Sequence, residues 1–215
     1  MTIGGLRRVA AVALLPLVLA AAAPPAAVTD AVSRVKASGC RNVPGIGVGI
    51  VVADELVVTA AHTVSGASVV LVDGADAQVV ALDTRTDIAV LHVPGRDRVD
   101  AIRRADTGRA GAARIAVLRD DRVEIIDAPV TRTATIRFRD AAAGTVVERR
   151  GLVLTGAVIG GDSGAPVLGD GGLLLGMVFA GSRGDAVSYA VDVSEVTGVL
   201  DRLGDVRRPV DTGSC

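Results

Sequence analysis

Short runs rich in Val and Ile, broken by turn residues, constrain the fold of this chain more than any other feature. Such runs are typical of β-strands, and their spacing of roughly 8–12 residues favours antiparallel barrels or a sandwich. Aromatic residues make up 1% of the chain and hydrophobic residues 50%, so the core has to be built from Val, Leu, Ile and Ala. The predicted strands cover residues 46–53, 56–60, 68–73, 77–83 and 87–93 in the first half, and 113–118, 122–127, 130–139, 145–155, 165–168, 173–180 and 186–192 in the second.

Two helices are predicted outside the strand pattern. The first covers residues 29–38, with Asp30 as its cap and a stripe of valines on one face. The second covers residues 194–203, with Ser194 as its N-cap and an apolar stripe formed by Val196, Val199, Leu200 and Leu203. Residues 105–111 are rich in Gly and polar residues and are predicted to link two halves of the fold.

The N-terminus has the pattern of a secretory signal peptide. Arg7 and Arg8 precede an apolar run over residues 9–23, which contains Pro16 and is too short to favour a membrane span. The protein is therefore expected to be secreted, or to reside in the cell envelope or periplasmic space. The predicted division is a signal peptide (1–23), an N-terminal segment with a short helix (24–43), a first barrel (44–107), a second barrel (108–193), and a C-terminal helix and tail (194–215).

The chain has two cysteines, Cys40 and Cys215. In an exported protein they most simply form a disulfide with each other. The sequence ASGC at residues 37–40 resembles a lipidation signal, but charged residues separate it from the apolar run that should directly precede it. Two cysteines this far apart offer no metal-ligand spacing, and no cofactor is predicted. The net charge of −1 gives no indication of nucleic acid or an acidic membrane as a partner.

Three polar residues stand at the edges of predicted strands. His62 ends the run LVVTAAH, whereas the other histidine, His92, lies inside IAVLHVP, where alternation can place it on a solvent face. Asp87 directly precedes an apolar strand, and a carboxylate that enters a core needs a partner. Asp83 is the rival carboxylate for that role. Ser163 lies in GGDSG, which a tight turn alone could also explain.

A serine hydroxyl becomes a nucleophile when a base takes its proton and when donors stabilise the oxyanion that forms. The flanking glycines allow the N–H groups of Gly161 and Ser163 to point into one hollow. With the order His62, Asp87 and Ser163, the segments TAAH, TDIAVL and GDSGAPV resemble the trypsin/chymotrypsin-like serine proteases. The resemblance covers residues 44–204 and is strongest to the exported bacterial branch that includes Deg-type and mycobacterial envelope proteases.

This resemblance implies an all-β fold of two six-stranded antiparallel barrels. It also implies that His62 is the general base, Asp87 its orienting partner and Ser163 the nucleophile, with oxyanion donors at Gly161 and Ser163. Hydrolases with a G-x-S-x-G elbow have a different chain order and a glycine where this chain has Ala165.

The same resemblance suggests a substrate pocket. It places Ala157 at the base and Ser188 on the far wall, and it lets the backbone of Phe179, Ala180 and Gly181 pair with the substrate. Because no acidic residue falls at the base, a small or aliphatic P1 residue is expected. The predicted function is an exported serine endopeptidase that acts through an acyl-enzyme on a protein or peptide. The alternative is a catalytically inactive protease-fold binding module at the cell envelope.

The sequence departs from the family pattern in several places. Thr63 follows His62, where digestive members have a cysteine, and Ala165 replaces the usual second glycine of GDSGG. No activation sequence is found whose new amino group could pair with Asp162, so the partner of Asp162 is left open. No PDZ domain is found after the predicted C-terminal helix.

Overall fold

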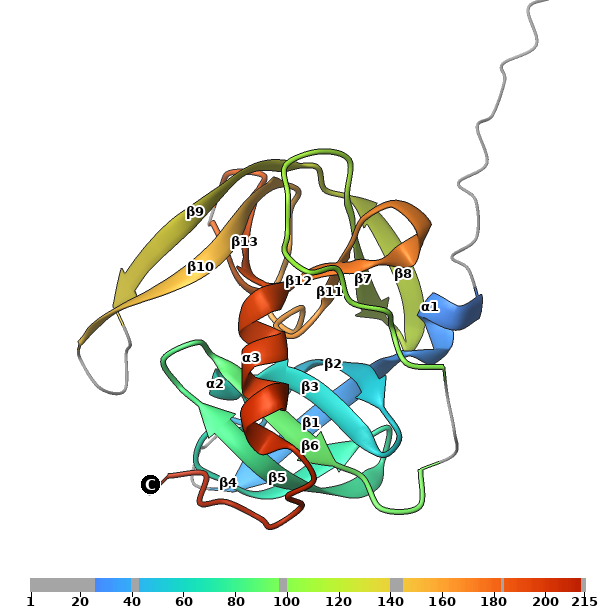
Figure 1. Ribbon diagram of the computed structural model, residues 1–215. Helices are drawn as coiled ribbons and strands as arrows, with labels where there is room; N and C mark the ends of the chain where they lie inside the picture. The colour runs from blue at the N-terminus through green and yellow to red at the C-terminus, as the bar shows by residue number, and fades with distance from the viewer. Residues whose placement is uncertain (1–25, 40–42, 97–99, 140–144, 183, 214–215) are drawn as a thin grey trace, which may run out of the picture.

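The computed structural model describes residues 26–39, 43–96, 100–139, 145–182 and 184–213. The predicted signal peptide, and Cys40 and Cys215 with their predicted disulfide, lie outside these residues. The strands form two units, one above the other in Figure 1, with a helix in front that spans both. No helix in the described part of the chain is both long and apolar enough to cross a membrane.

The first unit is a closed barrel of six strands in the order β1-β2-β3-β6-β5-β4. Every neighbouring pair is antiparallel, and β1 closes the barrel by pairing with both β2 and β4. Its interior is filled mainly by Val, Ile and Leu side chains. The strands are β1 (Val32–Gly39), β2 (Gly45–Ala53), β3 (Leu56–Ala60), β4 (Ala67–Val72), β5 (Ala75–Asp83) and β6 (Ile88–His92).

Strand β1 corrects the helix predicted over residues 29–38. The helix α1 (Ala26–Asp30) is short, and the chain then continues as a strand, so the first barrel begins well before residue 44. Ser33, Val35 and Ala37 face the interior and alternate with the more exposed Arg34 and Lys36. This alternation is typical of a strand. The extended form lets β1 form hydrogen bonds with both β2 and β4, and this pairing outweighs the helical spacing of the valines.

The second unit is a seven-stranded sheet in the order β8-β7-β11-β12-β13-β10-β9, which agrees with the seven strands predicted in the second half and has one strand more than the six-stranded barrel that the resemblance implies. All its neighbouring strands are antiparallel, and the hairpin of β9 and β10 extends away from the rest of the molecule (Figure 1). The strands are β7 (Arg114–Arg119), β8 (Arg122–Asp127), β9 (Val130–Arg139), β10 (Val146–Thr155), β11 (Pro166–Leu168), β12 (Leu174–Gly181) and β13 (Val187–Asp192).

The C-terminal helix α3 (Val193–Leu203) packs against β12 and β13 of the sheet and against β5 and β6 of the barrel. It buries the side chains of Val193, Val196, Val199 and Leu203. Its N-cap is Asp192, whose side chain accepts a hydrogen bond from the Ser194 N–H at 2.8 Å, and not Ser194 as predicted. Two short helical turns complete the fold, α2 (Ala61–Val64) and the 3₁₀ turn η1 (Asp170–Gly172) between β11 and β12.

Candidate active site

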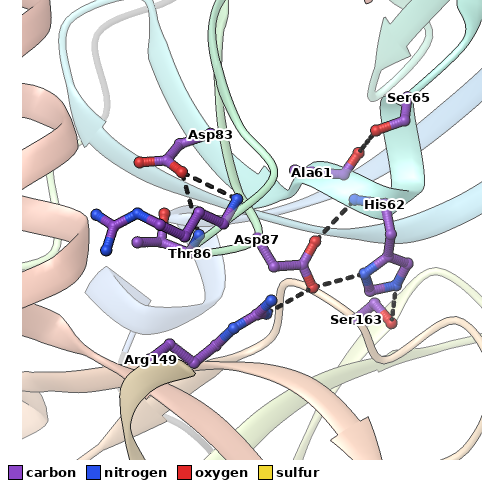
Figure 2. Close-up of polar contacts among 9 residues, drawn as sticks. Ala61, His62, Ser65, Asp83, Thr86, Asp87, Arg149 and Ser163 are labelled. Atoms are coloured by element: carbon purple, nitrogen blue, oxygen red, sulfur yellow. Dashed lines mark hydrogen bonds and ion pairs between the residues drawn. The ribbon is translucent and has the colours of Figure 1, made fainter. Parts of the chain in front are cut away.

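His62, Asp87 and Ser163 meet where the barrel faces the second sheet (Figure 2). The His62 Nδ1 lies 2.8 Å from the Asp87 Oδ2, and the His62 Nε2 lies 2.9 Å from the Ser163 Oγ. The Asp87 side chain is 6% exposed, whereas the His62 side chain is 46% exposed. The imidazole therefore connects a buried carboxylate to a hydroxyl at the surface.

The backbone around His62 is fixed to Asp87 by two more hydrogen bonds. The Ala61 N–H donates to the Asp87 carbonyl at 3.0 Å, and the His62 N–H donates to the Asp87 Oδ1 at 2.8 Å. Asp87 adopts a positive φ of 62°, a conformation that is uncommon outside glycine and found at functional sites when the surroundings impose it. Both carboxylate oxygens are thus used to orient the one histidine.

The rival carboxylate, Asp83, does not contact His62. Its Oδ1 accepts hydrogen bonds from the N–H groups of Arg85 and Thr86 at 3.1 Å, and its Oδ2 pairs with Arg202 at 3.0 Å. Asp83 therefore stabilises the turn before Asp87 and ties it to α3. The second histidine, His92, pairs with Glu55 at 3.2 Å at the other end of β6.

Ser163 lies on a turn of the second unit, and this turn is joined to the barrel by a hydrogen bond. The Val48 N–H in β2 donates to the Ser163 carbonyl at 2.7 Å, and the Gly164 N–H donates to the Val178 carbonyl at 2.8 Å. Gly164 has a φ of 93°, and a Cβ there would lie 1.9 Å from the Val48 carbonyl oxygen. Only glycine fits where the barrel and the sheet approach this closely.

Asp162 is paired with Arg119 at the end of β7, which resolves the question left open by the sequence. The two guanidinium Nη atoms contact the two carboxylate oxygens, with Nη2 at 2.8 Å from Oδ2. The Ile159 N–H donates to the same Oδ2 at 2.8 Å, and the Asp162 side chain is 1% exposed. The hydrogen bonds with Asp162 raise the pKa of Arg119 above its usual value.

The turn that this ion pair holds carries the two N–H groups predicted to bind an oxyanion. Gly161 has a φ of 98°, and the turn is closed by a hydrogen bond from the Asp162 N–H to the Ile159 carbonyl. Among the described residues, neither the Gly161 N–H nor the Ser163 N–H donates to another backbone carbonyl. Both donors are therefore available to a ligand.

A pocket of about 760 Å³ opens beside Ser163. It contains three of the predicted pocket residues, Ala157, Ala180 and Gly181, together with mostly small or aliphatic neighbours and Asp185. Phe179 and Ser188 are not among its lining residues, because both are buried in the sheet. Asp185 is exposed and accepts a hydrogen bond from the Ser182 Oγ at 3.4 Å.

Arg149 lies at the site but was not selected by reasoning from the sequence. It lies on β10, its side chain is 0% exposed, and its Nη1 is 3.4 Å from the Asp87 Oδ2 (Figure 2). It is the middle one of three consecutive charged residues, Glu148, Arg149 and Arg150, and such a run indicates solvent-facing side chains. The described residues contain no group of three or more His, Cys, Asp and Glu side chains that could hold a metal ion.

A His–Asp–Ser cluster between a six-stranded antiparallel barrel and a second antiparallel sheet defines the class of chymotrypsin-like serine proteases. The sequence profile described as the trypsin-like peptidase domain matches residues 47–177, and the chain belongs to this family.

Individual relatives agree with this assignment. The serine protease Rv3671c of Mycobacterium tuberculosis is 29% identical over 177 residues, which is 79% of this chain and 44% of the relative. The chain thus spans less than half the length of that curated relative. The crystal structure of the active form of the Rv3671c protease superposes with a TM-score of 0.80 at 26% identity, over 88% of this chain and 87% of that one.

A more distant structure shares the fold alone. The HtrA-type protease AlgW, solved with a decapeptide, has a TM-score of 0.66 at 18% identity, over 82% of this chain and 65% of that one. The predicted resemblance to the trypsin-like proteases, with a mycobacterial serine protease among the relatives, is confirmed by these comparisons.

Proposed function

We propose that this chain is an exported serine endopeptidase that hydrolyses peptide bonds through His62, Asp87 and Ser163. One observation carries the proposal: the His62 imidazole lies within hydrogen-bond reach of both partners, at 2.8 Å from Asp87 and 2.9 Å from Ser163. A nucleophile, a base and an orienting group in this relation form the working unit of this protease class.

The geometry supports a two-step reaction. His62 Nε2 takes the proton of the Ser163 hydroxyl as the oxygen attacks the substrate carbonyl, while Asp87 holds the Nδ1 proton and stabilises the imidazolium. The N–H groups of Gly161 and Ser163 stabilise the oxyanion. His62 then gives the proton to the departing amine, leaving an acyl-enzyme. A water molecule, deprotonated by His62, attacks the ester and releases the acid, which restores Ser163.

The ion pair between Arg119 and Asp162 supports a site that is competent without an activation cleavage. In the digestive proteases a newly formed amino group pairs with the corresponding aspartate. Here the guanidinium of Arg119, a residue already in the chain, pairs with Asp162. The argument for the alternative function, an inactive binding module, was that Asp162 had no known partner to order the turn. The pairing of Asp162 with Arg119 removes that argument.

The substrate is proposed to bind as an added strand with a small or aliphatic P1 side chain. The register places Pro166 of β11 opposite Met177 of β12, so β12 continues past the end of β11 through Ala180 and Gly181. Among the described residues no strand pairs with the β11 side of Ala180 and Gly181, which suits the addition of a substrate backbone, and Phe179 is the third residue proposed for this pairing. The small side chains of Ala157 and its neighbours suit an aliphatic P1 residue.

The test is labelling with a fluorophosphonate, which reacts with activated serines. Wild-type protein is expected to be labelled and Ser163→Ala unlabelled, whereas folded wild-type protein that takes no label would contradict the proposal. A peptide library should then show cleavage after small or aliphatic residues in both wild type and Asp185→Asn. Cleavage strictly after Arg or Lys would contradict the proposed specificity. Export is tested separately by finding the protein outside the cytoplasm, with residues 1–23 removed.

A further inference from the structure

Two exposed isoleucines lie at the turn that carries Gly161. Ile46, on β2, is 50% exposed, and Ile159, two residues before Gly161, is 61% exposed. A Cβ on Gly161 would lie 3.8 Å from the Ile46 Cγ2, whereas Ile159 lines the pocket beside Ser163. Ile46 is not among the residues that line this pocket, and it belongs to the barrel. An aliphatic side chain is thus exposed beside a proposed oxyanion donor, outside the pocket for the P1 residue.

The proposed reaction decides which half of a substrate lies at Ile46. Because His62 gives its proton to the departing amine, the leaving-group half has to lie beside His62. The acyl half is proposed to lie in the pocket and along β12. Strand β2 packs against α2, the helix that carries His62, and a Cβ on the neighbouring Gly47 would lie 2.8 Å from the Ser163 carbonyl oxygen. Ile46 therefore lies on the leaving-group side of Ser163.

The backbone of β2 has an open edge at Ile46. The Val48 N–H points away from β1, because it donates to the Ser163 carbonyl at 2.7 Å. Backbone directions in a strand repeat with a period of two, so the N–H and C=O of Ile46 point to the same side as those of Val48. Within the described residues, β3 pairs with β2 only from Ile50 onward. The edge at Ile46 therefore suits the addition of the leaving-group half as a strand.

The residue opposite Ile46 on β1 is Lys36, the only lysine in the sequence. Directly opposed residues project from the same face of a sheet, with their Cβ atoms about 5 Å apart. Lys36 is exposed, and its side chain forms no ion pair or hydrogen bond with another described residue. An extended peptide advances about 3.3 Å per residue, so a side chain two positions beyond the one at Ile46 is within reach of the ammonium. A carboxylate at that point would pair with this flexible cation.

We propose that Ile46 and Lys36 select the leaving-group half of the substrate. They favour an aliphatic side chain in the first two positions after the scissile bond and an acidic side chain in the next two. The inference rests on the proposed function, in which His62 protonates the departing amine. It adds a preference on the leaving-group side to the proposed preference for a small or aliphatic P1 residue.

The preference is measured with peptides that share one acyl half and differ only after the scissile bond. Each kcat/KM is divided by that of the same protein on the methyl ester of this acyl half. Ile46→Thr should reduce the preference for Leu over Ser by about fivefold, because less apolar surface is covered. The matched variant Ile159→Thr should change the P1 preference and keep this one.

The charge of Lys36 is tested by reversal. Wild-type protein should prefer Glu over Lys beyond the aliphatic position by about threefold, as expected for an exposed ion pair, and Lys36→Glu should prefer Lys over Glu. In about 1 M NaCl, which screens charges beyond about 3 Å, the preference for Glu should disappear while the preference for Leu remains. If Lys36→Glu does not fold, Lys36→Gln takes its place and should lose the preference without reversing it.

Binding without turnover separates this inference from the proposed function. In Ser163→Ala protein, the Kd values of the same peptides, measured by fluorescence anisotropy, should follow the same order and respond to both substitutions. Equal or undetectable binding of all the peptides would overturn the inference, and so would a wild-type charge preference in Lys36→Glu, even if the wild type is a protease. If the binding order is found but the wild type takes no fluorophosphonate label and hydrolyses no peptide, the proposed function fails and the binding preference stands.

Discussion

Replacing Arg119 with Met tests whether the ion pair with Asp162 holds the turn of residues 159–163, which carries the two proposed oxyanion donors. The substitution keeps most of the apolar stem but leaves the Asp162 carboxylate, 1% exposed, without its bidentate cation. Breaking a buried pair by removing one partner costs about 3–5 kcal/mol if the structure does not move. Opening the turn breaks the two hydrogen bonds between Ile159 and Asp162, at about 1 kcal/mol each.

Breaking the two hydrogen bonds of the turn costs less than keeping the unpaired Asp162 carboxylate buried. We therefore expect the turn to open while the rest of the fold is kept. The free energy of unfolding should fall by about 2 kcal/mol, while kcat falls on the order of 10²–10³-fold because the Gly161 donor is no longer held in place. Denaturant unfolding and steady-state hydrolysis of a peptide ester measure the two quantities. Arg122→Met is the matched control, since Arg122 faces Arg119 across the β7–β8 turn and is exposed.

The double variant Arg119→Met with Asp162→Asn separates charge from packing. Because the asparagine carries no charge, its burial without a partner costs less, and the double variant should be more stable than Arg119→Met alone. Wild-type kcat and wild-type stability in Arg119→Met would refute the role of the pair, and so would an equal loss in Arg122→Met.

Two further predictions concern the carboxylates of the barrel. Asp87→Asn should lower kcat by about 10⁴-fold, as expected when the orienting carboxylate is lost, whereas Asp83→Asn should keep most of the activity because Asp83 serves the turn and α3; equal losses in ester hydrolysis would contradict the assignment. At Glu55, the hydrogen bond from the Gly95 N–H, followed by that with His92, lowers the pKa of the carboxyl below 4.5. The stability it contributes is present above that pH and is lost as the pH falls through the lowered value, so urea midpoints of wild type and Glu55→Gln should differ at pH 7 and converge towards pH 3.

The strands of the second half could be predicted closely, because each run of Val, Ile and Leu ends at a residue that favours turns. Strand β1 could not, since Val32 and Val35 have helical spacing and only pairing with β2 and β4 selects the extended form. The alternation of Ser33, Val35 and Ala37 with Arg34 and Lys36 was the signal for a strand.

His62, Asp87 and Ser163 could be selected as candidates because they lie at strand ends in a recognisable order. Arg119 and Arg149 were not, because arginines are usually exposed and nothing local marks these two as buried or paired. Their roles arise from contacts across the fold, 43 residues apart for Arg119 and Asp162. Phe179 and Ser188 were assigned to the pocket from their positions in the motifs alone. The register shift between Val178 and Ala180 is a local irregularity of β12 that motif position does not reveal.

The hydrogen bond from the Val48 N–H to the Ser163 carbonyl joins the barrel to the second unit at the candidate active site. We therefore expect the activity of this protein to depend on how well its two units fit together. The proposed base, His62, and the proposed nucleophile, Ser163, belong to separate units, so heat or denaturant that loosens their contact is expected to abolish hydrolysis while each set of strands still gives its full circular dichroism signal. Thermal inactivation should therefore precede melting, and a ligand that bridges both halves should bring the two transitions together.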